Sequence, residues 1–231
     1  MKKTAHIVLP ALAVACAVTS GANAALVAGW SIPTAVAAST TGSNYTYGAA
    51  DQGAQTTGSS LTGYHALTAT VWSSPTGNGS TYSFSSNNWT IGDYYQVSVS
   101  TIGYSGVSIS WDQTRSGTGP ATFDAVMSVD GGANWTTILA GYSVVQAGFA
   151  GTNTTSWSSV TPQAGFTLTA VAGAAADEQA NVLFRLRSTV TTAAAGTNRV
   201  DNIVVSGTAI PAPGAIALLG VAGLVGSRRR R

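Results

Sequence analysis

The chain has 231 residues, of which 45% are hydrophobic and only 8% are charged, and its formal net charge is +2. Six of the ten basic residues lie at the two ends, so residues 25–209 carry four arginines against eight acids, a net charge near −4 that leaves no basic patch for nucleic acid. The single cysteine, Cys16, belongs to the N-terminal segment, which excludes disulfides and thiolate metal sites from the rest of the chain.

Residues 1–24 have the layout of a secretory signal peptide. Lys2 and Lys3 give a positive start, residues 7–18 form an apolar core, and the small residues around Ala24 fit cleavage before Ala25. We therefore expect the export machinery and signal peptidase as partners. A lipoprotein signal around Cys16 is the alternative, but the residue three places before this cysteine is not leucine.

Residues 25–209 are long enough for one domain with a sizeable core, and we expect it to be built from short strands. Apolar and polar residues alternate in short runs between turns, so that side chains two apart share a face. The predicted strands are 30–32, 82–84, 89–91, 94–100, 107–111, 122–129, 135–139, 142–145, 181–187 and 199–205. Residues 39–62 are expected to be mostly loop, and 168–180 to hold a short helix or helical turn. This pattern predicts an all-β, antiparallel sandwich.

Residues 210–231 form a distinct C-terminal segment. Pro211 and Pro213 precede thirteen apolar or small residues, 214–226, which as a helix would be about 20 Å long against a hydrocarbon core of ~30 Å. The four arginines that follow resist translocation and would stay on the cytoplasmic side. A short apolar helix is therefore expected here, and a hydrophobic tail docked on the domain is the alternative.

This tail resembles the PEP-CTERM sorting signal of Gram-negative bacteria, with Ile210 in place of valine and Ala212 in place of glutamate. The resemblance implies processing by an exosortase-like enzyme, transient association with the inner membrane, and delivery to the cell surface or the extracellular space. The residues expected to act in sorting are Pro211, Pro213, Arg228, Arg229, Arg230 and Arg231.

Three stretches of the domain, 107–112, 128–135 and 198–205, are similar to parts of the galactose-binding-like jelly roll of secreted bacterial proteins and carbohydrate-binding modules. The resemblance covers most of residues 25–209 and implies a jelly-roll-like sandwich. It also implies a structural Ca²⁺ ion, held in part by Asp201 on the closing strand. Anchoring of a turn by Asp201, or its pairing with Arg199, is the alternative.

The segment from Ser128 to Trp135 has the spacing of an Asp-box, Ser-x-Asp-x-Gly-x-x-Trp. Asp130 can accept hydrogen bonds from turn amides, and the glycines permit positive φ. A single copy predicts a stable hairpin rather than a sialidase-type propeller. Trp135 and Trp111, which lie within apolar alternation, are expected in the core.

Catalytic residues are not predicted. His65 is the only histidine after the signal peptide, and we expect it to be a solvated loop residue. The sequence therefore predicts neither a set of zinc ligands nor a Ser-His-Asp triad. Lysine is absent from residues 25–209. A secreted hydrolase stays open as an alternative because two of the eight acids could converge across a glycosidic bond.

Sugar binding requires exposed aromatic rings that stack on a pyranose face. Trp72, Trp89 and Trp157, which have polar neighbours, are the candidates, and burial of these rings beneath loops is the alternative. The sequence therefore predicts an exported, non-catalytic protein of the cell envelope or extracellular matrix, structural or polysaccharide-interacting. A carbohydrate-binding module that uses these tryptophans is a second possibility.

Overall fold

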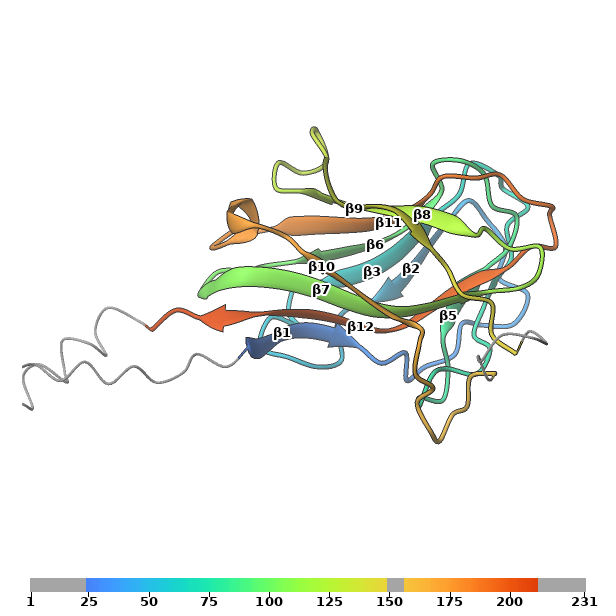
Figure 1. Ribbon diagram of the computed structural model, residues 1–231, viewed down its shortest axis with the longest axis horizontal. Coiled ribbons are helices and arrows are strands. Elements are labelled where there is room, and N and C mark those ends of the chain that lie inside the picture. The colour runs from blue at the N-terminus through green and yellow to red at the C-terminus, as the bar shows by residue number, and fades with distance from the viewer. Residues whose placement is uncertain (1–23, 149–155, 212–231) are drawn as a thin grey trace, which may run out of the picture.

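The computed structural model describes residues 24–148 and 156–211, which form two six-stranded antiparallel sheets packed as a sandwich (Figure 1). The first sheet contains β1 (Ala24–Trp30), β4 (Trp72–Ser73), β5 (Phe84–Ser86), β7 (Tyr104–Arg115), β10 (Thr167–Val171) and β12 (Asn198–Ala209). The second sheet contains β2 (Asn44–Gly48), β3 (Ser60–Tyr64), β6 (Tyr94–Val99), β8 (Thr122–Ser128), β9 (Thr136–Ser143) and β11 (Val182–Ser188). The predicted all-β sandwich is confirmed.

Strand order explains how distant segments become neighbours. The first sheet runs β10-β7-β12-β5-β4, and β1 pairs with the C-terminal half of β12. The second sheet runs β2-β3-β6-β11-β8-β9. The first sheet is centred on β12, the last strand in the sequence, which pairs with β7, β5 and β1. The fold therefore closes only when the C-terminal strand is in place.

The structure corrects several predicted strand boundaries. The first strand is β1, so Trp30 ends a strand instead of beginning one. The predicted loop 39–62 contains β2 and the start of β3, and the two predicted strands 135–139 and 142–145 are one strand, β9. Residues 89–91 form no strand, since the indole of Trp89 folds back and donates a hydrogen bond to the carbonyl of Ser86.

Of the short helix or helical turn predicted within 168–180, the structure confirms only a helical turn. Residues 167–171 form β10, which pairs with β7 along its whole length, and only Ala174–Ala176 form a single turn of 3-10 helix, η1. The alanine-rich sequence favours a helix locally, but the free edge of β7 offers backbone hydrogen bonds that override this propensity.

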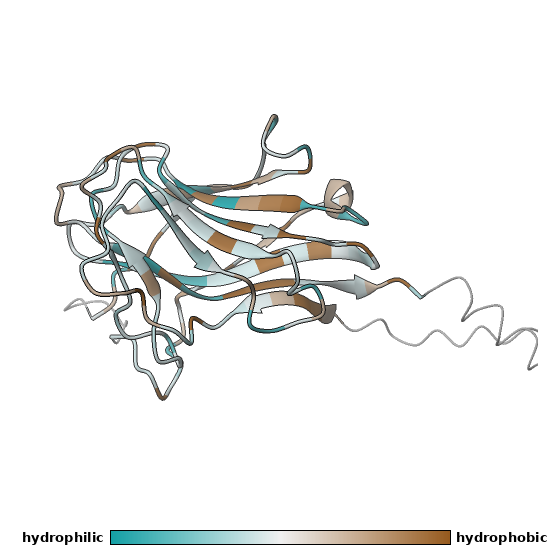
Figure 2. Cartoon of the chain, turned by 180° about the vertical axis from the view of Figure 1, so that it is seen from behind, coloured by the Kyte–Doolittle hydropathy of each residue, from teal (hydrophilic) through white to brown (hydrophobic). Residues whose placement is uncertain are grey.

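The hydrophobic core lies between the sheets, and hydrophobic and polar positions alternate along the strands (Figure 2). Its largest rings are at most 1% exposed: Trp30, Trp72, Trp89, Trp111, Phe84, Tyr95, Phe123 and Phe184. Trp72 stacks on Phe84 with ring centroids 5.3 Å apart. The aromatic residues thus build the interior, as the sequence predicts for Trp111.

His65 is not the solvated loop residue that the sequence suggests. It is fully buried, with Nδ1 3.0 Å from a carboxylate oxygen of Asp93 and Nε2 2.9 Å from the hydroxyl of Ser86. Burial alone would raise the pKa of Asp93, but hydrogen bonds from His65 and from the amides of Thr90 and Ala66 lower it below its usual value. His65 therefore links a loop to the core.

The predicted Asp-box hairpin is confirmed. The carboxylate of Asp130 accepts hydrogen bonds from the Ser128 hydroxyl at 2.7 Å and from the Asn134 amide at 3.0 Å, and the Trp135 indole donates to the Gly132 carbonyl. The placement of Trp135 in the core is wrong. Its ring is only partly buried, because the hairpin carries it over the outer face of the second sheet.

No helix within 24–148 and 156–211 is long and apolar enough to cross a membrane. Pro211 is the last described residue and is exposed, whereas Pro213 and Arg228, Arg229, Arg230 and Arg231 lie outside the described residues. The sorting signal and the apolar helix thus stay predictions.

Candidate functional site

The three tryptophans predicted to stack on sugars are buried. Trp72 and Trp89 are 1% and 0% exposed, and Trp157 is 5% exposed. Trp72 and Trp89 point into the sandwich because they carry the apolar positions that its core requires, whatever the polarity of their sequence neighbours. The expectation of exposed rings at these positions is therefore wrong.

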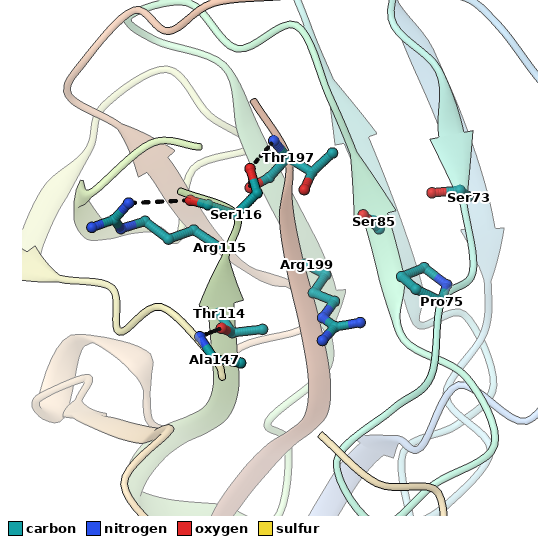
Figure 3. Close-up of a pocket in the computed structure, with 9 residues that line it drawn as sticks. All are labelled: Ser73, Pro75, Ser85, Thr114, Arg115, Ser116, Ala147, Thr197 and Arg199. Carbon is teal, nitrogen blue, oxygen red and sulfur yellow. Dashed lines mark hydrogen bonds between the residues drawn. The ribbon is translucent and has the colours of Figure 1, made fainter. Parts of the chain in front are cut away.

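A hollow of about 380 Å³ lies on the outer face of the first sheet instead (Figure 3). It is lined by Ser73, Pro75, Ser85, Thr114, Arg115, Ser116, Ala147, Thr197 and Arg199. Five of these nine residues carry hydroxyl groups, and none of them carries a carboxylate or an imidazole. A volume of this size is within the range of small-molecule sites.

Strand register creates the hollow. Ser73 on β4 is opposite Ser85 on β5, Ser85 is opposite Arg199 on β12, and Arg199 is opposite Thr114 on β7. These four residues form one row across four neighbouring strands. Because side chains alternate between faces, all four point away from the core while Trp72, Phe84 and Val200 point into it. Small hydroxyl side chains around Arg199 leave the space that the hollow occupies.

The hydroxyls of the hollow differ in how far the protein already uses them. The Thr114 hydroxyl donates to the carbonyl of Val145 and accepts from the amide of Ala147, and the Ser85 hydroxyl donates to the carbonyl of Asn198. The hydroxyls of Ser73 and Thr197 have no hydrogen-bond partner within the described parts of the chain. These two groups are therefore available to a ligand.

Arg199 is held in place by neutral groups. Its guanidinium carbon lies 4.8 Å from the ring centroid of Trp157, and its Nη1 donates to the carbonyl of Thr76 at 3.2 Å. Burial lowers the pKa of Arg199, and the charge of Asp201 partly opposes this effect. The role of Trp157 is thus to position the arginine and not to bind a ligand with its own ring.

Arg115 forms another part of the lining and extends away from Arg199 (Figure 3). Its Nε donates to the carbonyl of Val144, and its Nη1 donates to the carbonyls of Ser116 and Gly117. The ion pairs of residues 24–148 and 156–211 are His65–Asp93 and Arg187–Asp124, so neither arginine of the hollow forms one with a described carboxylate.

Asp201 anchors a loop to β12. Its carboxylate accepts hydrogen bonds from the amides of Asn78 and Asn202 at 2.6 and 2.8 Å and from the hydroxyl of Ser80 at 2.6 Å. The described residues contain no group of three acidic, histidine or cysteine side chains that could hold a metal ion. Protein N–H and O–H donors point at Asp201 where a cation would need oxygen ligands, and Ca²⁺ binding there stays a prediction.

A second surface, on the outer face of the other sheet, contains a row of stacked side chains. The ring centroids of Tyr64 and Tyr94 are 5.2 Å apart, and the guanidinium of Arg185 lies 3.8 Å from the Tyr94 ring and 4.0 Å from the Trp135 ring. Gln96 accepts a 2.6 Å hydrogen bond from Arg185. These side chains cover most of one another's flat faces, so mainly their edges are left for a ligand. This surface is therefore the weaker candidate.

The hollow could not be found by scanning for motifs. Arg199 is one of several polar residues at the start of β12, and Ser73, Ser85 and Thr114 are ordinary serines and threonines far from it in the sequence. Only the pairing of β4, β5, β12 and β7 brings them together. The one available signal is that Ser73, Ser85 and Arg199 each stand next to an apolar core residue, namely Trp72, Phe84 and Val200.

No protein-family model matches the sequence, and no curated protein matches it. Among solved structures, the K1 cleaved adhesin domain of Lys-gingipain from Porphyromonas gingivalis is 14% identical, with a TM-score of 0.41 over 77% of this chain and 95% of that chain. A CBM22-1 xylan-binding domain from Paenibacillus barcinonensis is 15% identical, with a TM-score of 0.37 over 77% and 99%. CBM35 from Cellvibrio japonicus is 17% identical, with a TM-score of 0.37 over 78% and 96%.

Proposed function

We propose that this protein is a non-catalytic, polysaccharide-interacting domain, and that the hollow on β4, β5, β12 and β7 is its binding site. The observation that carries the proposal is the in-register row Ser73, Ser85, Arg199 and Thr114, which places the Ser73 hydroxyl and the Arg199 guanidinium in one open hollow.

The lining suits a polyhydroxylated ligand. Hydroxyl groups both donate and accept hydrogen bonds, and a guanidinium offers several donors in a fixed plane, which together match the ring edges of a sugar. The ring of Pro75 adds an apolar contact at the side of the hollow. Because the lining has no carboxylate or imidazole, it offers no general acid and base for hydrolysis, and binding is the chemistry that it supports.

The test is affinity electrophoresis of the purified protein through gels that contain single polysaccharides, both neutral and acidic. We expect retardation by at least one polymer. Ser73→Leu fills the mouth of the hollow with an apolar side chain at an exposed position. We expect this change to weaken binding roughly ten-fold or more, equivalent to about 1.4 kcal/mol.

Ser143→Leu is the matched control. Ser143 is also an exposed serine on an edge strand, but it lies on β9 in the other sheet. Binding should survive this change. Absence of retardation by every polymer would overturn the proposed function, and equal weakening by both substitutions would remove the hollow as its site.

We further propose that the protein reaches the cell envelope or extracellular matrix through residues 1–24 and 210–231. The resemblance of the tail to PEP-CTERM signals supports this, with Pro211, Pro213 and the terminal arginines as the recognised residues. The intact mass of the protein recovered from its native host tests both cleavages. A full-length mass in the cytosolic fraction would contradict the proposal.

A further inference from the structure

The charge of the hollow narrows the class of ligand that it fits. Two of the four arginines of residues 25–209 line it, and no acid does, although acids outnumber arginines two to one in this part of the chain. The hollow is therefore a locally cationic site on an acidic domain. A cationic site of this kind attracts anions, whereas its charge has little effect on neutral ligands.

Arg199 is available for a charged partner. The groups that contact its guanidinium are an aromatic ring and a backbone carbonyl, at 4.8 and 3.2 Å, and both are neutral. Asp201 is the acid whose charge acts on it, but Asp201 forms no ion pair with it and its carboxylate is held by Asn78, Ser80 and Asn202. A partly buried guanidinium without a bonded carboxylate favours an anion that can replace its lost hydration.

We propose that the hollow selects acidic glycans, with the carboxylate of a uronic acid residue bound by Arg199 and the sugar hydroxyls bound by Ser73 and Thr197. A planar guanidinium donates two parallel hydrogen bonds to a carboxylate, which gives orientation as well as affinity. Arg115 adds positive charge at another part of the lining, where the next acidic residue of a polymer would experience it.

This inference rests on the proposed function, and one set of titrations separates the two. Isothermal titration calorimetry compares oligogalacturonate and oligomeric alginate, two uronates of different stereochemistry, with their carboxyl-reduced counterparts. For at least one of them, we expect the affinity of the acidic form to exceed that of the reduced form by about ten-fold or more, as for a charge-assisted hydrogen bond. Its affinity should also fall as NaCl is raised. A sulfated galactan oligosaccharide distinguishes a carboxylate from other anions, and it should bind less well than the uronate.

Arg199→Gln should abolish the preference for the acidic form. Arg187→Gln is the control, since Arg187 is a partly exposed arginine on the other sheet that pairs with Asp124, and it should leave the preference unchanged. The comparison of acidic and reduced ligands with the unaltered protein stands even if Arg199→Gln fails to fold.

Each contrary outcome has a definite meaning. Equal affinity for acidic and reduced forms, tighter binding of the sulfated galactan, or an acidic preference that persists in Arg199→Gln would overturn this inference and leave the polysaccharide-binding proposal intact. Failure to bind any of these oligomers or any polymer of the electrophoresis panel would overturn both.

Discussion

Arg185 and Arg199 are partly buried arginines on the two opposite outer faces of the sandwich, and their neighbours give them different roles. Arg185 lies between the rings of Tyr94 and Trp135 and is hydrogen-bonded to Gln96, so its flat faces are covered. Arg199 contacts one ring, and the hollow opens beside it. The first arginine joins the hairpin to its sheet, whereas the second can exchange its surroundings for a ligand.

Asp201 and Asp130 show how the surroundings give two identical side chains different pKa values. Burial raises the pKa of Asp201 to about 6, with Asp112 adding to the effect and hydrogen bonds from Ser80, Asn78 and Asn202 opposing it. Hydrogen bonds from Asn134 and Ser128 lower the pKa of the exposed Asp130 to about 2. Because the pKa of Asp201 is raised on folding, its contribution to stability is fully present below about pH 4 and is lost as the pH rises through 6.

We therefore predict two well-separated carboxyl titrations in one NMR experiment. The carboxyl carbon of Asp201 should titrate near pH 6 and that of Asp130 near pH 2, with assignments made from Asp201→Asn and Asp130→Asn. The cause is loss of hydration at Asp201 and a gain of donors at Asp130. A midpoint below pH 4 for Asp201 would show that the three donors, and not burial, control its charge.

At the scale of the elements, close approach of the two sheets depends on one glycine. Gly63 on β3 faces the indole of Trp72 on β4, and a Cβ atom placed on Gly63 would lie 2.2 Å from that ring. This distance is far inside van der Waals contact. Trp72 cannot easily move, because it is buried, stacks on Phe84 and donates a hydrogen bond to the carbonyl of Gly42.

Gly63→Ala should therefore destabilise the domain by about 1–3 kcal/mol, as expected for overpacking in a close-packed core. Urea unfolding followed by tryptophan fluorescence measures the change. Gly117→Ala is the control, since its added methyl group would meet its nearest neighbour at 3.6 Å. Equal stability of the Gly63→Ala variant and the unaltered protein would mean that the sheets are farther apart at this point than the structure shows.

The elements also show what a sequence can and cannot predict. Apolar and polar residues alternate along β6, β7, β8, β11 and β12, and this predicts these strands and the sandwich. A strand with one buried and one solvent-exposed face gives its sequence a hydrophobic period of two residues. Short strands such as β4 lack that signal. Burial of Trp72, Trp89 and His65 and the register of Ser73, Ser85 and Arg199 depend on contacts between distant segments, which local sequence does not encode.

At the scale of the whole molecule, the hollow lies toward the opposite end of the sandwich from Ala24 and Pro211, the first and last described residues. In Figure 1, β5, which carries Ser85 of the hollow, is at one end, and the start of β1 and the end of β12 are at the other. The hollow includes Arg199 near the start of β12, whereas Ala209 ends this strand beside the start of β1. At roughly 3.3 Å per residue, the two ends of β12 are separated by more than 30 Å. A protein attached to a surface through residues that follow Ile210 would therefore present the hollow to its surroundings.

This arrangement predicts that the point of attachment controls binding. In a Cys16→Ser background the chain has no other cysteine, so Ile210→Cys and Ser73→Cys each provide a single thiol for coupling to a maleimide surface. Protein coupled through residue 210 should retain the polysaccharide-binding capacity of free protein, because attachment there leaves the hollow open. Protein coupled through residue 73 should lose most of it, because the linker crosses the row of Ser85 and Arg199. Loss of capacity at both positions would contradict the separation of the two ends, and full capacity at residue 73 would place the binding surface elsewhere on the sandwich.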